Sequence, residues 1–139
     1  MEFLTWQCKI FTHFSKLKKK KFVKIPVTSF SNIGDRKTSI IHTKIRHRCS
    51  GHNADLCRVN LKDDTHCVYG HVFEDAIHCF LECPLYQDDR ATLFNCFNNI
   101  VPISIEYILF GYNEISEELN TLLFKSVHTF IRHSCRFNN

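Results

Sequence analysis

The chain of 139 residues lacks any long uninterrupted hydrophobic run. No window approaches the roughly 20 apolar residues that a membrane-spanning helix needs, so the sequence predicts no membrane partner. A secretory signal is also missing, because Thr5, Gln7 and Lys9 interrupt the apolar positions near the start and a lysine run follows. We therefore expect an intracellular protein, cytoplasmic or nuclear, whose eight cysteines are reduced.

The residue patterns of an enzyme are missing as well. No cysteine lies in a glycine-rich elbow, and no carboxylate is spaced to orient a Cys–His pair. Adjacent aspartates occur at Asp63–Asp64, in a polar turn, and at Asp88–Asp89, where a predicted helix opens. Neither pair fits the strand–turn–strand in which the aspartates of a polymerase hold two metal ions. The sequence therefore predicts a chain without catalytic activity of its own.

The net charge of +4 conceals an uneven distribution of charged residues along the chain. Residues 1–26 carry +6 and residues 27–52 carry +4, whereas residues 53–139 carry −6. A basic front part and an acidic remainder suit a protein that meets RNA or DNA on one side. A solvated basic tail on an ordinary domain explains the same distribution, and the oligomeric state is not indicated.

Apolar residues recur at helical spacing in several segments, which predicts a small, mainly α-helical domain at 32–137. The basic segment at 1–31 precedes it. We expect this segment to be disordered or poorly packed, although residues 3–17 have the spacing of a short amphipathic helix. Asp35 is predicted to cap a first helix with Ile41, Ile45 and Cys49 on one face.

Further elements are expected after the first helix. Asn53 is the expected N-cap of a short turn through Leu56 and Val59, 75–83 forms a helix, Pro84 opens the next, and a short segment at 103–109 is ended by Gly111. The last helix, capped by Ser116, is the clearest. Its apolar stripe consists of Leu119, Leu122, Leu123, Val127, Phe130 and Ile131.

One irregular turn, at 66–83, has the composition of a metal-binding knuckle. Cys67, His78 and Cys83 offer two thiols and an imidazole close to a glycine turn, and zinc in structural sites takes four such ligands. A second cysteine is usual before the glycine of such a turn, but Tyr69 occupies that position, and a phenol is a poor zinc ligand at neutral pH. The sequence predicts three ligands and leaves the fourth open.

Candidates for the fourth ligand are His66, His71 and Cys79. The alternative is that no metal binds at all. The cysteines of 66–83 would then be small buried hydrophobic residues, and the histidine a core or surface residue.

Basic residues of the first predicted helix are candidates for contact with RNA or DNA. Lys37, Lys44 and Arg48 recur at spacings that place them on one face, and Arg46 lies nearby. The alternative is that these side chains form the solvated side of a surface helix. No recognition helix or base-stacking motif is present, so a sequence-specific reader is not implied.

An ordered series of short motifs covers about three quarters of the chain. The series is Gly34–Lys37, Thr43–Ser50, Asn53–Leu56, Cys67–Gly70, Glu74–His78, Glu82–Tyr86, Leu109–Gly111 and Phe130–Arg132. It resembles the C-terminal region of reverse transcriptases encoded by non-LTR retrotransposons of the jockey-like type. The first 25 or so residues look unrelated to that family.

The resemblance implies a region that follows the polymerase domain of an RNA-directed DNA polymerase. In the family this region carries a zinc-binding and nucleic-acid-binding module, with ligands expected at Cys67, position 69, His78 and Cys83. Tyr69 departs from that pattern. The resemblance thus implies a non-catalytic fragment of a retroelement protein; the alternative is a degenerate relic, or a small helical protein with no metal and no specific ligand.

Overall fold

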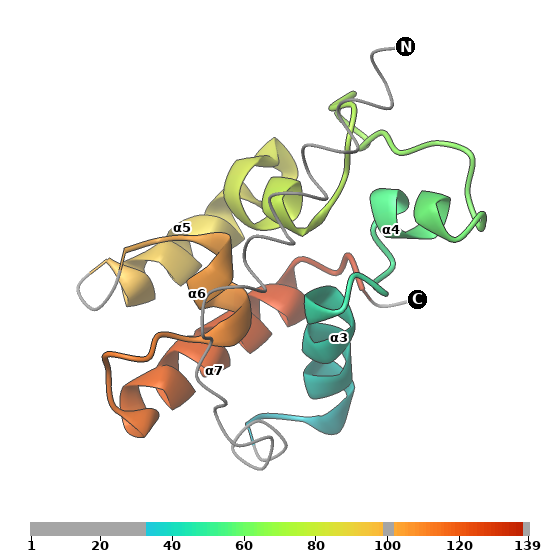
Figure 1. Ribbon diagram of the computed structural model, residues 1–139. Coiled ribbons are helices and arrows are strands. Elements are labelled where there is room, and N and C mark those ends of the chain that lie inside the picture. The colour runs from blue at the N-terminus through green and yellow to red at the C-terminus, as the bar shows by residue number, and fades with distance from the viewer. Residues whose placement is uncertain (1–32, 99–101, 138–139) are drawn as a thin grey trace.

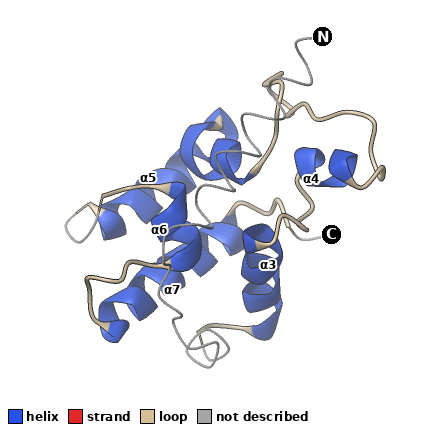
Figure 2. Ribbon diagram, in the orientation of Figure 1, coloured by secondary structure: helices blue, strands red, loops and turns tan. Residues whose placement is uncertain are grey.

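The computed structural model describes residues 33–98 and 102–137, and these residues form helices joined by irregular loops (Figure 2). No β-strand occurs in these two ranges. The prediction of a small, mainly helical domain is therefore confirmed. The basic segment at 1–31, with its predicted disorder and its amphipathic spacing, lies outside the described residues.

The long C-terminal helix is the centre of the arrangement. In chain order the elements are α3 (Arg36–Arg46), α4 (Asn53–Arg58), the π-helical turn η1 (His78–Glu82), the 3₁₀ turn η2 (Pro84–Tyr86), α5 (Gln87–Phe97), α6 (Ile105–Phe110) and α7 (Glu117–His133). Helices α3, α5 and α6 all contact α7, and α3 also contacts α6. Figure 1 shows α4 apart from this group, with the chain arching from it towards η1.

Side-chain caps start the helices where the sequence predicts them. Asp35 Oδ1 accepts a hydrogen bond from the Thr38 amide at 2.9 Å, and the Ser116 side chain accepts from the amide of Leu119. Asn53, in contrast, is the first helical residue of α4 and not its cap, which is His52. The Asn53 side-chain amide instead donates to the His66 carbonyl at 2.6 Å, tying α4 to the following loop.

Aromatic and branched residues from most of these elements form one core. The ring of Phe80 in η1 stacks on that of Phe130 in α7, with centroids 4.6 Å apart. Burial of each such side chain stabilises the fold by roughly 1.5–3 kcal/mol. The largest apolar residues among those almost completely buried are Phe80, Phe97, Phe124, Ile45, Leu93, Ile108, Leu109, Leu123, Ile131 and Val127.

Two predicted helix faces are wrong in part. On α7, Leu119 and Leu122 are exposed, whereas Asn120 and His128 are buried, because this helix is contacted by both α3 and α5 and its buried face is turned towards them. On α3, Ile45 is buried as predicted. Cys49 is exposed, because the helix ends at Arg46 before reaching it.

Candidate metal centre

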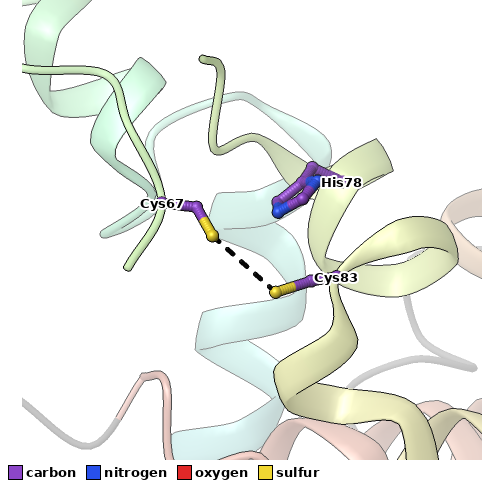
Figure 3. Close-up of side chains that lie close together, drawn as sticks. All are labelled: Cys67, His78 and Cys83. Carbon is purple, nitrogen blue, oxygen red and sulfur yellow. Dashed lines mark hydrogen bonds between the residues drawn. The ribbon is translucent and has the colours of Figure 1, made fainter. Parts of the chain in front are cut away.

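The loop at 66–75, called the knuckle loop below, closes a tight turn around Cys67. The Gly70 amide donates to the Cys67 carbonyl, and the Cys67 amide donates to the His71 carbonyl, both at 2.9 Å. Gly70 has a φ of +80°, a left-handed conformation that a side chain disfavours. The turn holds the Cys67 side chain in a buried position facing η1 (Figure 3).

Tyr69 lies at the tip of this turn and contributes its backbone rather than its side chain. Its amide donates to Cys67 Sγ at 3.2 Å, while the residue is 61% exposed. An N–H donor stabilises negative charge on the sulfur that it contacts. The turn therefore gives the Cys67 sulfur a backbone hydrogen-bond donor, while Tyr69 itself is exposed.

The helical turn η1 brings His78 and Cys83 to the same side. The predicted helix at 75–83 is present, but its hydrogen bonds are π-helical: the Cys83 amide donates to the His78 carbonyl at 2.7 Å. In an α-helix, residues five apart point about 140° away from each other. The wider π turn reduces that angle, and such turns are frequent at functional sites.

Three ligand atoms, from Cys67, His78 and Cys83, lie within 4.8 Å of one another, and all three residues are buried. The two sulfurs are 3.9 Å apart, and the three side chains converge in Figure 3. Zinc binds each thiolate at about 2.3 Å in tetrahedral geometry, which places two bound sulfurs about 3.8 Å apart. The spacing of the two cysteines therefore suits a zinc ion without movement of the backbone.

His78 is the unsatisfied member of this group. Both of its ring nitrogens are buried, and within residues 33–98 and 102–137 neither has a hydrogen-bond partner. Leaving a buried polar group unpaired costs roughly 1–3 kcal/mol of folding free energy. Binding of an ion to a ring nitrogen of His78 would remove part of that cost. The nearest charge is Glu82, whose Oε2 lies 3.5 Å from Nδ1.

Burial sets the protonation of these ligands when no cation is present. It raises the pKa of the Cys83 thiol and lowers the pKa of His78. A neutral imidazole is the form that binds metal, and a divalent ion would displace the thiol proton. Metal binding at this site should therefore release protons.

The candidates for the fourth ligand differ in position. His66 is exposed and pairs with Asp64. Cys79 is buried, but its thiol faces Glu74, with Sγ 4.0 Å from Oε1. Neither belongs to a group of clustered ligand atoms in the part of the chain that the structure describes.

His71 is the candidate whose ring lies beside one of the three ligands, His78. It forms a second cluster with His78 and Glu82, whose ligand atoms are also within 4.8 Å of one another. The sequence analysis missed Glu82. Its spacing of four residues from His78 on a predicted helix was the signal that could have found it.

The four basic residues predicted to contact nucleic acid do not form one surface. Lys37 and Lys44 are exposed on α3. Arg46 is partly buried: its Nε donates to the Leu109 carbonyl, and its guanidinium carbon lies 5.4 Å from the ring centroid of Phe124.

Burial lowers the pKa of Arg46 to about 10, and its contacts inside the fold remove its guanidinium from the predicted surface. Arg48 lies beyond the end of α3, 3.9 Å from Asp55, with 22% of its side chain exposed. The predicted stripe on a single helix face is therefore wrong for Arg48, because α3 ends at Arg46.

A second polar cluster, which no sequence pattern predicted, is formed by Ser50, His52 and Asp55. Ser50 Oγ donates to Asp55 Oδ2 at 2.6 Å and lies 2.5 Å from His52 Nδ1, and all three residues are buried. Because the serine proton goes to Asp55, Nδ1 must donate to Oγ and cannot accept its proton. The order of contacts is thus unlike that of a hydrolase triad and indicates a role in packing.

Comparisons of this chain with models of protein families, with curated proteins and with solved structures found no match. None of the helices in the described ranges has both the length and the apolar character to cross a membrane.

Proposed function

We propose that this chain is a non-catalytic module in which a structural zinc ion joins the knuckle loop to η1. Cys67, His78 and Cys83 would supply three ligands. The observation that carries the proposal is the 3.9 Å separation of the two buried sulfurs beside an imidazole without a partner among the described residues. Zinc would supply a fixed tetrahedral link between the knuckle loop and η1.

Zinc suits this donor set better than other common divalent ions. Thiolates are soft ligands and disfavour Mg²⁺ and Ca²⁺, which take oxygen ligands. Two thiolates and an imidazole are instead common among structural zinc sites. Because Cys67 and Cys83 lie 16 residues apart in sequence, binding would also couple to folding of the loop between them.

We further propose that the module is a fragment of a retroelement reverse transcriptase, from the region after the polymerase domain, and that it binds RNA or DNA. The ordered motif series between about residues 32 and 137 supports the first part of this proposal. The exposed Lys37 and Lys44 on α3 support the second, because phosphate contacts require solvated cations. An intracellular location would follow from this origin.

One observation favours a different function. The second ligand position is occupied by Tyr69, whose side chain is exposed. The chain would on this view be a degenerate relic or a small helical protein, with Cys67 and Cys83 as ordinary buried residues. It would then fold without metal and bind no specific ligand.

Zinc stoichiometry of the purified, reduced full chain separates the two proposals. We expect one zinc per chain, lost in Cys83→Ser and retained in Cys96→Ser, because Cys96 is exposed and outside the cluster. A Tyr69→Cys variant serves as a positive control. Zinc bound by Tyr69→Cys alone would contradict the metal-dependent function and support the relic.

A further inference from the structure

We propose that His71 supplies the fourth zinc ligand through its Nε2 atom, in place of the cysteine that the motif would have at position 69. This inference depends on the proposed function, namely that Cys67, His78 and Cys83 bind zinc. The site would then consist of two sulfur and two nitrogen ligands, a set that suits a divalent ion of intermediate softness. Zinc is the ion expected to bind it.

His71 contacts the proposed site through both its backbone and its ring. Its carbonyl accepts the hydrogen bond from the Cys67 amide at 2.9 Å, so the residue lies directly across the turn from one ligand. Its imidazole is stacked on that of His78, with centroids 4.0 Å apart and an angle of 11° between the planes. His71 is therefore in contact with two of the three other proposed ligands.

The two ring nitrogens of His71 are in different environments. The Phe73 amide donates to Nδ1 at 3.3 Å, and Nδ1 lies 3.2 Å from the Phe73 carbonyl oxygen. A metal on Nε2 would require the ring proton on Nδ1, which would then donate to the Phe73 carbonyl in place of accepting from the Phe73 amide. Metal-bound histidines generally make such a bond with their second nitrogen, which fixes tautomer and ring orientation.

The ring of His71 is partly exposed to solvent, and its Nε2 lies near the carboxylate of Glu82. The side chain is 45% exposed, and because His71 is clustered with His78 and Glu82 but not with the two cysteines, zinc binding would require its ring to turn towards the sulfurs. Its Nε2 is 3.8 Å from Glu82 Oε2, and the same carboxylate oxygen lies 3.5 Å from His78 Nδ1. Glu82 would thus orient His78 from outside through Nδ1, leaving Nε2 of that ring for the ion, whereas Nε2 of His71 would exchange its contact with Glu82 for the ion.

The other candidates have contacts that turn them away from the site. The ring of His66 pairs with Asp64, and the thiol of Cys79 faces Glu74. Tyr69 uses its amide as a donor to Cys67 Sγ and exposes its phenol. Glu82 is the remaining competitor, because its carboxylate is itself a possible zinc ligand.

The test is titration of the reduced, metal-free full chain with Co²⁺, followed by displacement with Zn²⁺. The proteins compared are the wild type, His71→Ala, His71→Cys, Glu82→Gln and the control His66→Ala. Because loss of even an outer partner costs 10–100-fold in affinity, we expect His71→Ala to lose at least about 100-fold. His66→Ala should behave like the wild type, and Glu82→Gln should show the smaller loss of an outer partner.

The Co²⁺ spectrum gives a second readout that a purely structural role would not change. We expect the intense visible bands of a tetrahedral site in the wild type. His71→Cys should keep tetrahedral bands and gain sulfur-to-metal charge-transfer absorption from a third thiolate. Circular dichroism would check that each variant retains its helices.

Three outcomes would overturn the inference in distinguishable ways. If His71→Ala kept wild-type zinc affinity and spectrum while Cys83→Ser lost both, His71 would not be a ligand but the zinc module would stand. A larger loss in Glu82→Gln than in His71→Ala would assign the fourth position to the carboxylate. If the wild type bound neither ion, the inference and the proposed function would both be wrong.

Discussion

The buried histidine pair between α3 and α7 is the most unusual feature of this fold at the scale of single residues. His42 Nδ1 and His128 Nε2 are 3.2 Å apart, and both residues are almost fully buried. Only one proton can occupy that contact, so the two rings cannot both be charged. Burial, together with the cation of Arg46, lowers the pKa of both rings, that of His128 to about 4.

This pair predicts loss of stability in mild acid. An unfolded histidine has a pKa of about 6.5, so below that pH the unfolded chain binds more protons than the folded one. The contribution of His128 is complete above pH 6.5 and is lost as the pH falls towards about 4. Between pH 7.5 and 5.0 the wild type should lose about 2 kcal/mol more unfolding free energy than His128→Gln.

Urea unfolding of both proteins at the two pH values measures this difference. Both proteins contain the same candidate metal ligands, so any pH dependence that comes from metal binding cancels in the difference between their unfolding free energies. Parallel pH profiles would show that His128 is not held neutral in the fold.

Gly34 makes a second prediction at this scale, because it approaches the same pair. Its φ is +70°, and a Cβ atom built on it would lie 3.0 Å from His128 Nδ1. Gly34→Ala should therefore cost about 1–2 kcal/mol, from the backbone conformation and the close contact together. The matched control is Gly51→Ala, where a Cβ meets nothing within 4 Å. Equal urea midpoints for the two variants would contradict the prediction.

At the scale of elements, an ion pair between Arg136 and Glu74 connects the segment after α7 to the knuckle loop. The Arg136 guanidinium donates to both carboxylate oxygens of Glu74, with Nη2 to Oε2 at 3.0 Å, and also to the Gly51 carbonyl at 2.8 Å. Glu74 is buried, and its amide and carbonyl bond Thr65 and Ala54. Its carboxylate thus needs Arg136 as a counter-charge.

Removal of this counter-charge should destabilise the knuckle loop more than the helical core. Breaking a buried pair costs about 3–5 kcal/mol, and partial exposure of Arg136 reduces our expectation for Arg136→Gln to about 2–3 kcal/mol. Arg132→Gln is the control, because its pair with Asp35 is about half exposed and is screened by solvent. Urea midpoints give the two losses. Hydrogen exchange of Arg136→Gln should show faster exchange at 65–75, and unchanged exchange there would refute the assignment.

Helix starts could be predicted from sequence because they depend on neighbours in the chain. The side chains of Asp35 and Ser116 accept hydrogen bonds from amides three residues further along the chain. A cap of this kind can therefore be recognised from the amino-acid sequence alone. Burial of Asn120 could not be predicted in the same way. Its side chain is buried because it bonds both the amide and the carbonyl of Tyr112, in a different loop.

The candidate metal site was predictable to the same extent. Spacing around a glycine turn identified Cys67, His78 and Cys83, which the structure brings together. It could not choose among His66, His71 and Cys79. That choice depends on the π-helical turn and on ring stacking between His71 and His78, neither of which has a sequence signal.

At the scale of the whole molecule, charge separates the chain into unlike parts. Residues 27–52 carry +4 and residues 53–139 carry −6. Of the basic side chains on α3, Lys37 and Lys44 remain exposed, whereas Arg46 lies against Phe124 and Leu109. A polyanion approaching the described part of the molecule would meet its positive potential on α3 and repulsion from the acidic remainder.

This distribution predicts how affinity for nucleic acid depends on salt. Each phosphate contact contributes about 0.7 to the slope of log affinity against log salt for a single strand and about 0.9 for duplex DNA. The double variant of Lys37→Ala and Lys44→Ala should therefore reduce the slope by about 1.4 with single-stranded RNA. Lys44→Ala alone should reduce it by about 0.7, whereas Lys125→Ala, the same charge change on an exposed position of α7, should leave it unchanged.

Fluorescence anisotropy with a labelled single-stranded RNA and a labelled DNA duplex, from 50 to about 200 mM salt, measures these slopes. Equal effects of Lys44→Ala and Lys125→Ala would mean that net charge alone acts, and that α3 is not the binding face. If no slope changed in any variant, the contacts would lie outside α3. Because Arg46 supports the packing of α3 on α7, it is left intact, so that a lost contact is not confused with a lost fold.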